Sequence, residues 1–157
     1  MERFMELYRT VYKDLYRLAY YYVGNAADAQ DLVQEAVLAA YENFGKLKEE
    51  EAFRAWIFRI LVNCCRKHWR KMRRPEAAAE CPEGFYEPEL SAGPRVQELL
   101  CRLSKEERLI VVLTVFGGYK GEEIARILKK NHSTVRSKYR RALKKLELEI
   151  RREEAQE

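Results

Sequence analysis

The sequence predicts an all-α protein made of two small helical domains. On both sides of a central stretch, apolar residues recur at three- and four-residue steps, the spacing of amphipathic helices. All four prolines fall between positions 75 and 94, and the proline-free segments on either side can be helical throughout. Because 157 residues suffice for two small domains, we predict domains at 1–74 and 95–151, joined by a linker at 75–94.

The charges are distributed unevenly between these three parts. Basic residues crowd two segments, Arg66 to Arg74 and Arg136 to Lys145, while five glutamates make the linker acidic. The net charge of +5, from 30 basic and 25 acidic residues, is too small to establish a polyanionic partner by itself. We therefore predict a flexible acidic linker between two domains that each carry a local basic surface.

Three helices are predicted in the first domain. The first carries an apolar stripe that begins at Phe4 and ends near Gly24. Asn25 can cap the second helix, whose stripe extends to Phe44. The third begins around Phe53 and continues into the first basic cluster. Each helix has one core-facing stripe, which favours a bundle.

The second helix also has a polar side. Asp28, Asp31 and Glu35 lie at i, i+3 and i+7 and project together, with Gln34 beside them. A solvated acidic face is the common arrangement on surface helices. The other interpretation is a docking face for a basic partner, and the residues alone leave both open.

The third helix has a strip of mixed chemistry. Asn63, Lys67 and Arg70 lie at i, i+4 and i+7, next to Trp56. An amide, two cations and an aromatic ring suit phosphates and an unstacked base. The cations alone are explained equally well by a helix C-terminus, where the helix dipole favours positive charge.

The second domain has the spacing of a helix-turn-helix. After a short amphipathic turn from Val96 to Leu103, Ser104 and Glu107 form a capping box for a helix that runs to Gly117. A short helix at 122–128, a polar turn at 129–133 and a longer basic helix then follow. The second helix of this motif reads base edges in the major groove. The side chains expected to do so are Thr134, Arg136, Ser137, Lys138, Arg140 and Arg141.

A helical hairpin with a solvated charged face is the alternative for this segment. The small Ala125 and the basic longer helix both favour docking into a DNA groove instead.

Both ends of the chain resemble the extracytoplasmic-function (ECF) group of bacterial RNA polymerase sigma factors. The segment from Asp28 to Glu35 is similar to the polymerase-docking motif of region 2 in that family. The segment 53–63 is similar to its promoter-melting helix. Segments 103–108, 122–125 and 134–142 resemble region 4.

The resemblance implies a sigma factor that binds RNA polymerase core and directs initiation at minus-ten and minus-thirty-five elements. Region 2 would dock on the beta-prime coiled coil, and region 4 would contact the beta flap. The implied polymerase-docking residues are Asp28, Asp31, Gln34 and Glu35. The implied minus-ten residues are Trp56, Asn63, Lys67 and Arg70, while the helix from Thr134 would read the minus-thirty-five element. The family also implies an anti-sigma factor that clamps both domains.

Four positions depart from the family pattern. Leu47 stands where many relatives place an aromatic beside a flipped base, and Lys120 stands where a capping Ser or Thr is usual. Lys129 and Ser133 replace glycines that are common in the turn. Since a non-glycine residue in a left-handed conformation costs roughly 1 kcal/mol, we expect Asn131 to adopt that conformation.

Other function classes find little support. No apolar run approaches the roughly 20 residues of a membrane span, and a signal-peptide core is missing, which predicts a cytoplasmic protein. The cysteines, Cys64, Cys65, Cys81 and Cys101, are irregularly spaced, so we expect reduced thiols. Cys64, Cys65 and His68 lie close together along the chain and could be considered as zinc ligands. However, the sequence contains no paired C-x-x-C motif to support a zinc site there. We therefore predict neither metal nor cofactor. Without a glycine-rich phosphate loop or a nucleophile elbow, we predict no enzymatic activity.

Two rival functions differ in their partners. A stand-alone helix-turn-helix regulator would bind duplex DNA without polymerase, but would need a sensor or dimerisation domain. An RNA-binding or structural helical protein would account for the basic clusters. It would leave the acidic stripe and the turn spacing unexplained.

Overall fold

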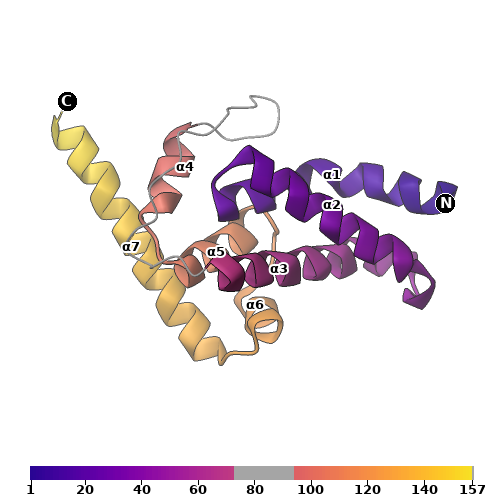
Figure 1. The fold of residues 1–157 in the computed structure, drawn as a ribbon. Coiled ribbons are helices and arrows are strands. Elements are labelled where there is room, and N and C mark those ends of the chain that lie inside the picture. Colours follow the sequence, from indigo (N-terminus) through magenta and orange to yellow (C-terminus); the bar gives the residue numbers. More distant parts are fainter. Residues whose placement is uncertain (73–93, 157) are drawn as a thin grey trace.

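The described part of the chain is helical and contains no strand (Figure 1). The computed structural model describes residues 1–72 and 94–156. These residues form seven α-helices: α1 (Glu2–Val23), α2 (Ala26–Glu42), α3 (Phe53–Met72), α4 (Pro94–Cys101), α5 (Lys105–Val115), α6 (Gly121–Leu128) and α7 (His132–Gln156). The all-α prediction is confirmed. The predicted linker at 75–94 lies, except for Pro94, outside the described residues.

The first three helices pack together as an N-terminal bundle. Helix α1 ends where the sequence predicts, at Gly24, which has a left-handed φ of 85°. Asn25 then caps α2, because its side-chain oxygen accepts a 2.8 Å hydrogen bond from the backbone N–H of Asp28. Residues with almost no exposure fill the interior of the bundle, among them Leu15, Leu18, Tyr21, Ile57, Phe58 and Leu61.

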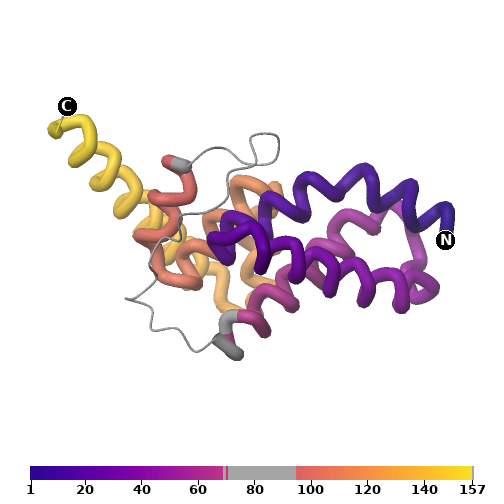
Figure 2. Tube along the Cα trace, turned by 45° about the horizontal axis from the view of Figure 1, so that its top comes forward, coloured from indigo at the N-terminus to yellow at the C-terminus, as the bar shows by residue number. Residues whose placement is uncertain are grey.

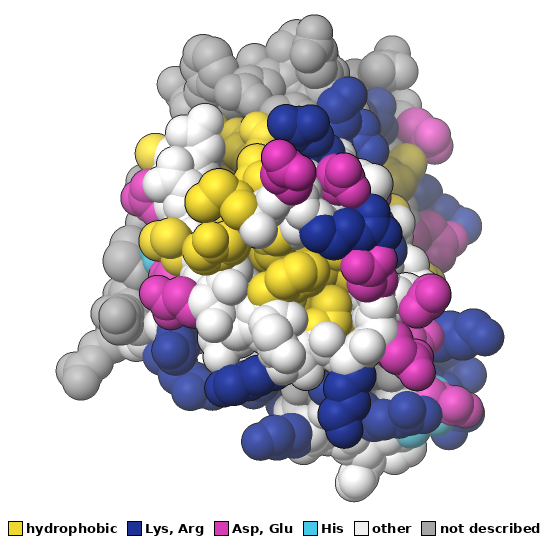
Figure 3. All heavy atoms as spheres, turned by 90° about the vertical axis from the view of Figure 1, so that its right-hand side faces the viewer, with side chains coloured by type: hydrophobic (Ala, Val, Ile, Leu, Met, Phe, Trp, Pro, Cys, Tyr) yellow, Lys and Arg dark blue, Asp and Glu magenta, His cyan; other side chains and the backbone are white. Residues whose placement is uncertain are grey.

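Aromatic rings close the end of this bundle at which α2 connects to α3. Helix α2 ends at Glu42 rather than at Phe44, which belongs to a separate 3-10 turn, Phe44–Lys46. A second 3-10 turn, Glu50–Ala52, leads into α3. The ring of Phe4 meets those of Phe44 and Phe53 edge-on, at centroid distances of 5.3 and 5.7 Å. Figure 3 shows hydrophobic side chains gathered on the face at this end.

Helices α4 to α7 form the C-terminal domain. The predicted capping box at the start of α5 is present: Glu107 N–H donates to Ser104 Oγ over 3.3 Å, and Ser104 N–H donates to Glu107 Oε1 over 3.1 Å. Gly117 and Gly118 follow the end of α5. A Cβ at Gly117 would lie 2.7 Å from the carbonyl oxygen of Leu113, so this turn requires glycine.

The helix-turn-helix differs from expectation in two details. Helix α7 begins at His132, two residues before the predicted start at Thr134. The left-handed residue is Lys129, with a φ of 56°, so the prediction that Asn131 adopts this conformation is wrong. Lys129 is the C-cap of α6, and the next N–H, that of Lys130, donates to the carbonyl of Ala125 over 2.9 Å. Because this hydrogen bond closes the end of α6 at Lys129, Lys129 is the residue that adopts the left-handed conformation.

The two domains lie against each other. Helix α5 contacts α1, and α6 lies beside α3, with which it lines a pocket (Figures 1 and 2). The long helix α7 packs on α5 and α6 and extends away from the bundle. The basic helix of the C-terminal domain is therefore held in one orientation to the rest of the domain.

The cysteines divide into two kinds. Cys64 and Cys65 are buried free thiols, and burial raises the pKa of Cys64 to about 11 and that of Cys65 further. Such thiols remain protonated and unreactive at neutral pH. Cys101 is disulfide-bonded, so the expectation of reduced thiols is wrong for this residue. Irregular spacing along the chain does not reveal which cysteines approach each other in space. Cys81 lies outside the described residues.

Candidate nucleic-acid and partner interfaces

The acidic side of α2 lies open on the surface. Asp31, Gln34 and Glu35 are exposed, as the spacing predicts. A pocket of about 140 Å³ brings Asp31 and Glu35 together with Asp28, and the opposite wall comes from α3, with Cys64, Lys67 and His68. The three carboxylates therefore share one surface, while Gln34 projects beside it.

Asp28 differs from the other residues of this side. Its side chain is 30% exposed, and Oδ2 accepts a 2.8 Å hydrogen bond from Nδ2 of Asn25. The same oxygen lies 3.7 Å from Nε2 of His68 on α3. Asp28 thus fixes the first turn of α2 against α3, whereas Asp31 and Glu35 are the carboxylates turned to solvent.

Leu38 adds an apolar residue to the acidic side. It lies seven residues after Asp31 and three after Glu35, which places all three on one side of α2, and it is 63% exposed. Leu38 is not among the docking residues predicted from the sequence, because it lies outside the buried stripe of α2. A large apolar residue off that stripe was the signal that could have identified it.

The predicted minus-ten strip lies along α3. Asn63, Lys67 and Arg70 are exposed, and Trp56 stands two turns before Asn63 on the same side of the helix. Lys67 also lines the acidic pocket of α2. The basic strip and the acidic side are therefore adjacent at this position.

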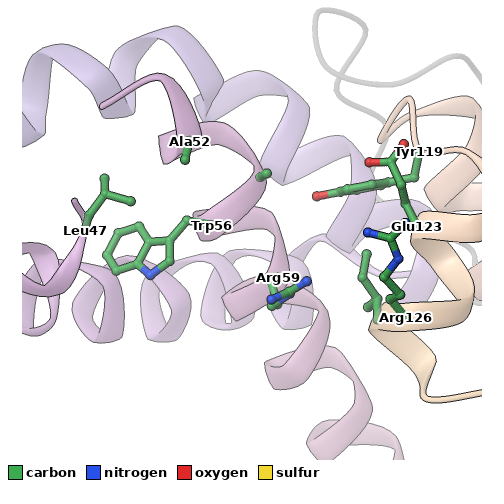
Figure 4. A pocket seen from close by; sticks show the side chains of 9 residues that line it. Leu47, Ala52, Trp56, Arg59, Tyr119, Glu123 and Arg126 are labelled. Carbon is green, nitrogen blue, oxygen red and sulfur yellow. The ribbon is translucent and has the colours of Figure 1, made fainter. Parts of the chain in front are cut away.

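Trp56 is half-buried in a second pocket, of about 280 Å³, between the two domains. Figure 4 shows Leu47 beside Trp56 on the bundle side, with Tyr119, Glu123 and Arg126 across the pocket. Leu47 stands next to the indole ring at the position where an aromatic is usual in the family.

The N-terminal part of α7 presents most of its predicted DNA-reading side chains to solvent. Arg136, Ser137, Arg140 and Arg141 are exposed, and Thr134 is half-buried. Lys138 is different, because its ammonium group is paired with the Glu106 carboxylate of α5, as is that of Lys130 in the turn. Glu106 therefore ties both the turn and the recognition helix to α5.

A second carboxylate of α5 also holds α7. Glu107 is buried, and its Oε1 accepts a 2.7 Å hydrogen bond from Lys145 Nζ. Burial acts to raise the pKa of Glu107, but the hydrogen bonds from Lys145 and Ser104 outweigh it, so the pKa is lowered. The carboxylate is therefore charged at neutral pH and keeps its ion pair with α7.

The described part of the chain has neither a clustered metal site nor a membrane-spanning helix. No three His, Cys, Asp or Glu side chains within it are grouped to hold a metal ion. None of the helices in 1–72 and 94–156 is sufficiently long and apolar to cross a bilayer.

Comparisons with known proteins agree on one family. The model of Sigma-70 region 2 matches residues 7–75, and that of Sigma-70 region 4 matches residues 94–146. The chain is 31% identical to RNA polymerase sigma factor SigV of Bacillus subtilis, covering 90% of this chain and 87% of the relative. It is 32% identical to the ECF sigma factor SigM of Mycobacterium tuberculosis, covering 91% of this chain and 74% of the relative.

Two solved structures are similar in fold. CnrH, in complex with the cytosolic domain of CnrY, has a TM-score of 0.69 at 28% identity, covering 96% of this chain and 89% of CnrH. The sigma factor RpoE of Bartonella quintana, in complex with the anti-sigma factor NepR, has a TM-score of 0.77 at 21% identity, covering 96% of this chain and 98% of RpoE.

The helical fold, the two basic surfaces and these matches define a promoter-specificity subunit of bacterial RNA polymerase. The chain belongs to the ECF family of sigma factors. Its function is to bind RNA polymerase and direct promoter-specific initiation of transcription.

Proposed function

We propose that three surfaces of this sigma factor, on α2, α3 and α7, have separate roles in transcription initiation. The exposed side of α2 docks on the beta-prime coiled coil of the polymerase core. The strip on α3 binds the minus-ten element, and the N-terminal part of α7 reads the minus-thirty-five element in the major groove. The observation that carries this division is that the exposed acidic residues lie on α2, whereas the exposed basic residues lie on α3 and α7.

The docking side of α2 suits a basic partner with some apolar surface. Asp31 and Glu35 supply charge, Gln34 supplies hydrogen bonds, and Leu38 supplies an apolar contact at the same side. A polar rim around an apolar contact is a common arrangement in protein interfaces. Asp28 contributes chiefly by holding the first turn of α2 in place.

The two basic surfaces suit two forms of DNA. Trp56 and Asn63 on α3 offer an aromatic ring and an amide, which fit an unstacked base, while Lys67 and Arg70 fit the phosphates of a single strand. On α7, Arg136 and Arg140 are exposed one turn apart, a spacing at which both reach the edge of a major groove. In this proposal α7 reads the duplex, and α3 binds the opened strand.

The domain boundaries and the partners follow from the same division. Residues 1–74 act as region 2 and 95–151 as region 4, with 75–94 between them. The protein works by binding rather than catalysis, alongside RNA polymerase in the cytoplasm. Because one of the two similar structures is a sigma factor in complex with an anti-sigma factor, we include an anti-sigma factor among the partners of this chain.

Charge reversal on α2 tests the docking surface. The variant Asp31→Lys with Glu35→Lys is expected to lose most of its affinity for core polymerase, because like charges then face each other across the interface. The control is Glu147→Lys with Glu154→Lys, two exposed acidic residues of α7 outside the proposed surfaces. Unchanged association of the first variant, measured by fluorescence anisotropy, would contradict the proposed docking surface.

A further inference from the structure

Glu106 of α5 binds two cations of the helix-turn-helix with one carboxylate. Its Oε1 is paired with the ammonium group of Lys130, in the turn before α7. Its Oε2 is paired with the ammonium group of Lys138, on α7 itself. Both carboxylate oxygens are therefore occupied, and two basic side chains of the DNA-binding motif point towards α5.

The start of α5 fixes the position of Glu106. It is the second residue of the helix and lies between Ser104 and Glu107, whose capping box closes the first turn. A carboxylate in the first turn is also stabilised by the positive end of the helix dipole. Glu106 therefore presents a negative charge to the turn and to α7 from a position that α5 determines.

Without this carboxylate, the two ammonium groups would repel each other. Burial and the neighbouring charge of Lys138 lower the pKa of Lys130, which shows how close the two cations lie. The side chains of Glu106, Lys130 and Lys138 are 29%, 35% and 25% exposed. Salt screens ion pairs that are partly withdrawn from water less than it screens exposed pairs. Both pairs are therefore expected to persist at the ionic strength of the cell.

Lys138 lies on the flank of α7, between its buried and its exposed sides. It stands three residues after Val135 and four before Ala142, both of which are buried. It also stands three residues before Arg141, which is exposed. From such an edge the long, flexible stem of a lysine can turn either towards the protein or towards a DNA backbone. The pair with Glu106 turns Lys138 towards the protein.

The arginines at the start of α7 are not restrained in this way. Arg136, Arg140 and Arg141 are exposed, and within the described part of the chain none of them is paired with a carboxylate. Further along α7, Lys145 is held by the next carboxylate of α5, that of Glu107, over 2.7 Å. The start of α5 therefore restrains lysines of this segment and leaves the three arginines open to solvent.

We propose that Glu106 limits the number of phosphate contacts of the helix-turn-helix, by holding Lys130 and Lys138 on α5 while the domain is bound to DNA. The inference rests on the proposed reading of the minus-thirty-five element by α7. Each lysine that reaches a phosphate adds affinity that is independent of sequence and falls steeply with salt. With two such contacts withheld, a larger share of the binding free energy comes from the base contacts of Arg136 and Arg140. Glu106 thus influences DNA recognition without touching DNA.

The salt dependence of DNA binding tests this proposal in the holoenzyme. Core polymerase carrying the full chain is titrated onto a duplex promoter and onto a shuffled duplex of equal length, between about 50 and 200 mM salt. Glu106→Gln is expected to steepen the plot of log K against log salt by roughly 1 to 2 on both duplexes, because each new phosphate contact contributes about 0.9. Glu154→Gln is the matched control, since it removes the same charge from an exposed position near the end of α7. An unchanged slope for Glu106→Gln would overturn the proposal.

Substitution of the two lysines gives a second test, which does not depend on the stability of the Glu106 variant. In the parent chain, Lys130→Gln with Lys138→Gln is expected to leave the salt slope unchanged, because neither lysine contacts a phosphate. In the Glu106→Gln background, the same two substitutions are expected to return the slope to the parent value. A parent slope that becomes shallower by roughly 1 to 2 would show that the lysines already contact DNA, and would overturn the proposal.

The arginines of α7 separate a failure of this inference from a failure of the proposed function. Arg136→Ala with Arg140→Ala is expected to weaken binding of the holoenzyme to the promoter duplex, because base contacts are lost. Unchanged affinity of that variant would overturn both the assignment of α7 and this inference. Weakened binding in that variant, together with an unchanged salt slope in Glu106→Gln, would overturn this inference alone.

Discussion

Glu106 of α5 pairs with two lysines of the helix-turn-helix at once, Lys130 in the turn and Lys138 in α7. Lys138 is 25% exposed, whereas Arg136 and Arg140 on the same helix are exposed to solvent. The basic residues at the start of α7 therefore have different roles. Arg136 and Arg140 remain open to solvent, whereas Lys138 holds α7 against α5.

Substitutions of Arg136 and Lys138 are expected to give different phenotypes. Arg136→Ala should weaken discrimination between promoter sequences by about 1 to 3 kcal/mol, because a bidentate contact to a base edge is lost. Lys138→Ala should lower the melting temperature while changing promoter preference less. Competition binding on a library of minus-thirty-five sequences, with thermal melts in parallel, measures both effects. Equal loss of discrimination in the two variants would contradict this division.

Lys129→Gly is expected to stabilise the protein. Lys129 holds a φ of 56°, and glycine adopts this conformation without the cost of roughly 1 kcal/mol that a side chain imposes. Asn131→Gly is the matched control, since Asn131 stands in the same turn outside the left-handed region, and it should be neutral or destabilising. Urea denaturation compares the two free energies of unfolding. A loss of stability in Lys129→Gly would contradict the assignment.

The side-chain amides of Asn25 and Asn63 are expected to have different roles, the first structural and the second functional. Asn25→Ala removes the cap of α2 and should cost about 1 kcal/mol of stability. Asn63→Ala, at an exposed position of α3, should leave the melting temperature unchanged and reduce open-complex formation on promoter DNA. Calorimetry and a permanganate footprint of the opened strand distinguish the two. A normal footprint for Asn63→Ala would remove this residue from the minus-ten surface.

Stability is expected to fall in acid partly through Glu107. Its pKa is lower in the folded protein than the ordinary value of 4.5, so the folded state favours the charged carboxylate. This contribution is fully present above the unfolded pKa and is lost as the pH falls through the folded pKa. The melting temperature should therefore drop below about pH 4.5, and the drop should be smaller in Glu107→Gln. An identical acid profile in the variant would contradict this role.

Much of the fold could be predicted from the sequence because it depends on local signals. Gly24 and Asn25 separate α1 from α2, and the Ser104–Glu107 capping box starts α5, as predicted. Each of these signals acts within a few residues of its position. The exposed polar sides of α2, α3 and α7 follow from the same helical periodicity.

The contacts between domains could not be predicted in this way. Arg108 appears in the sequence as one more charged residue of an amphipathic helix, yet it bonds to Tyr22 across 86 residues. The choice of Lys129 over Asn131 as the left-handed residue depends on where α6 closes, and the disulfide of Cys101 depends on spatial proximity. All three are properties of the assembled chain rather than of a local segment.

Run-off transcription with purified RNA polymerase core, on a library of promoters, tests the central claim most directly. We expect specific initiation only when this protein is added, from promoters that share one pair of minus-ten and minus-thirty-five sequences. Tight duplex binding by the protein alone, with no initiation on its addition to core polymerase, would contradict the account and favour a stand-alone regulator.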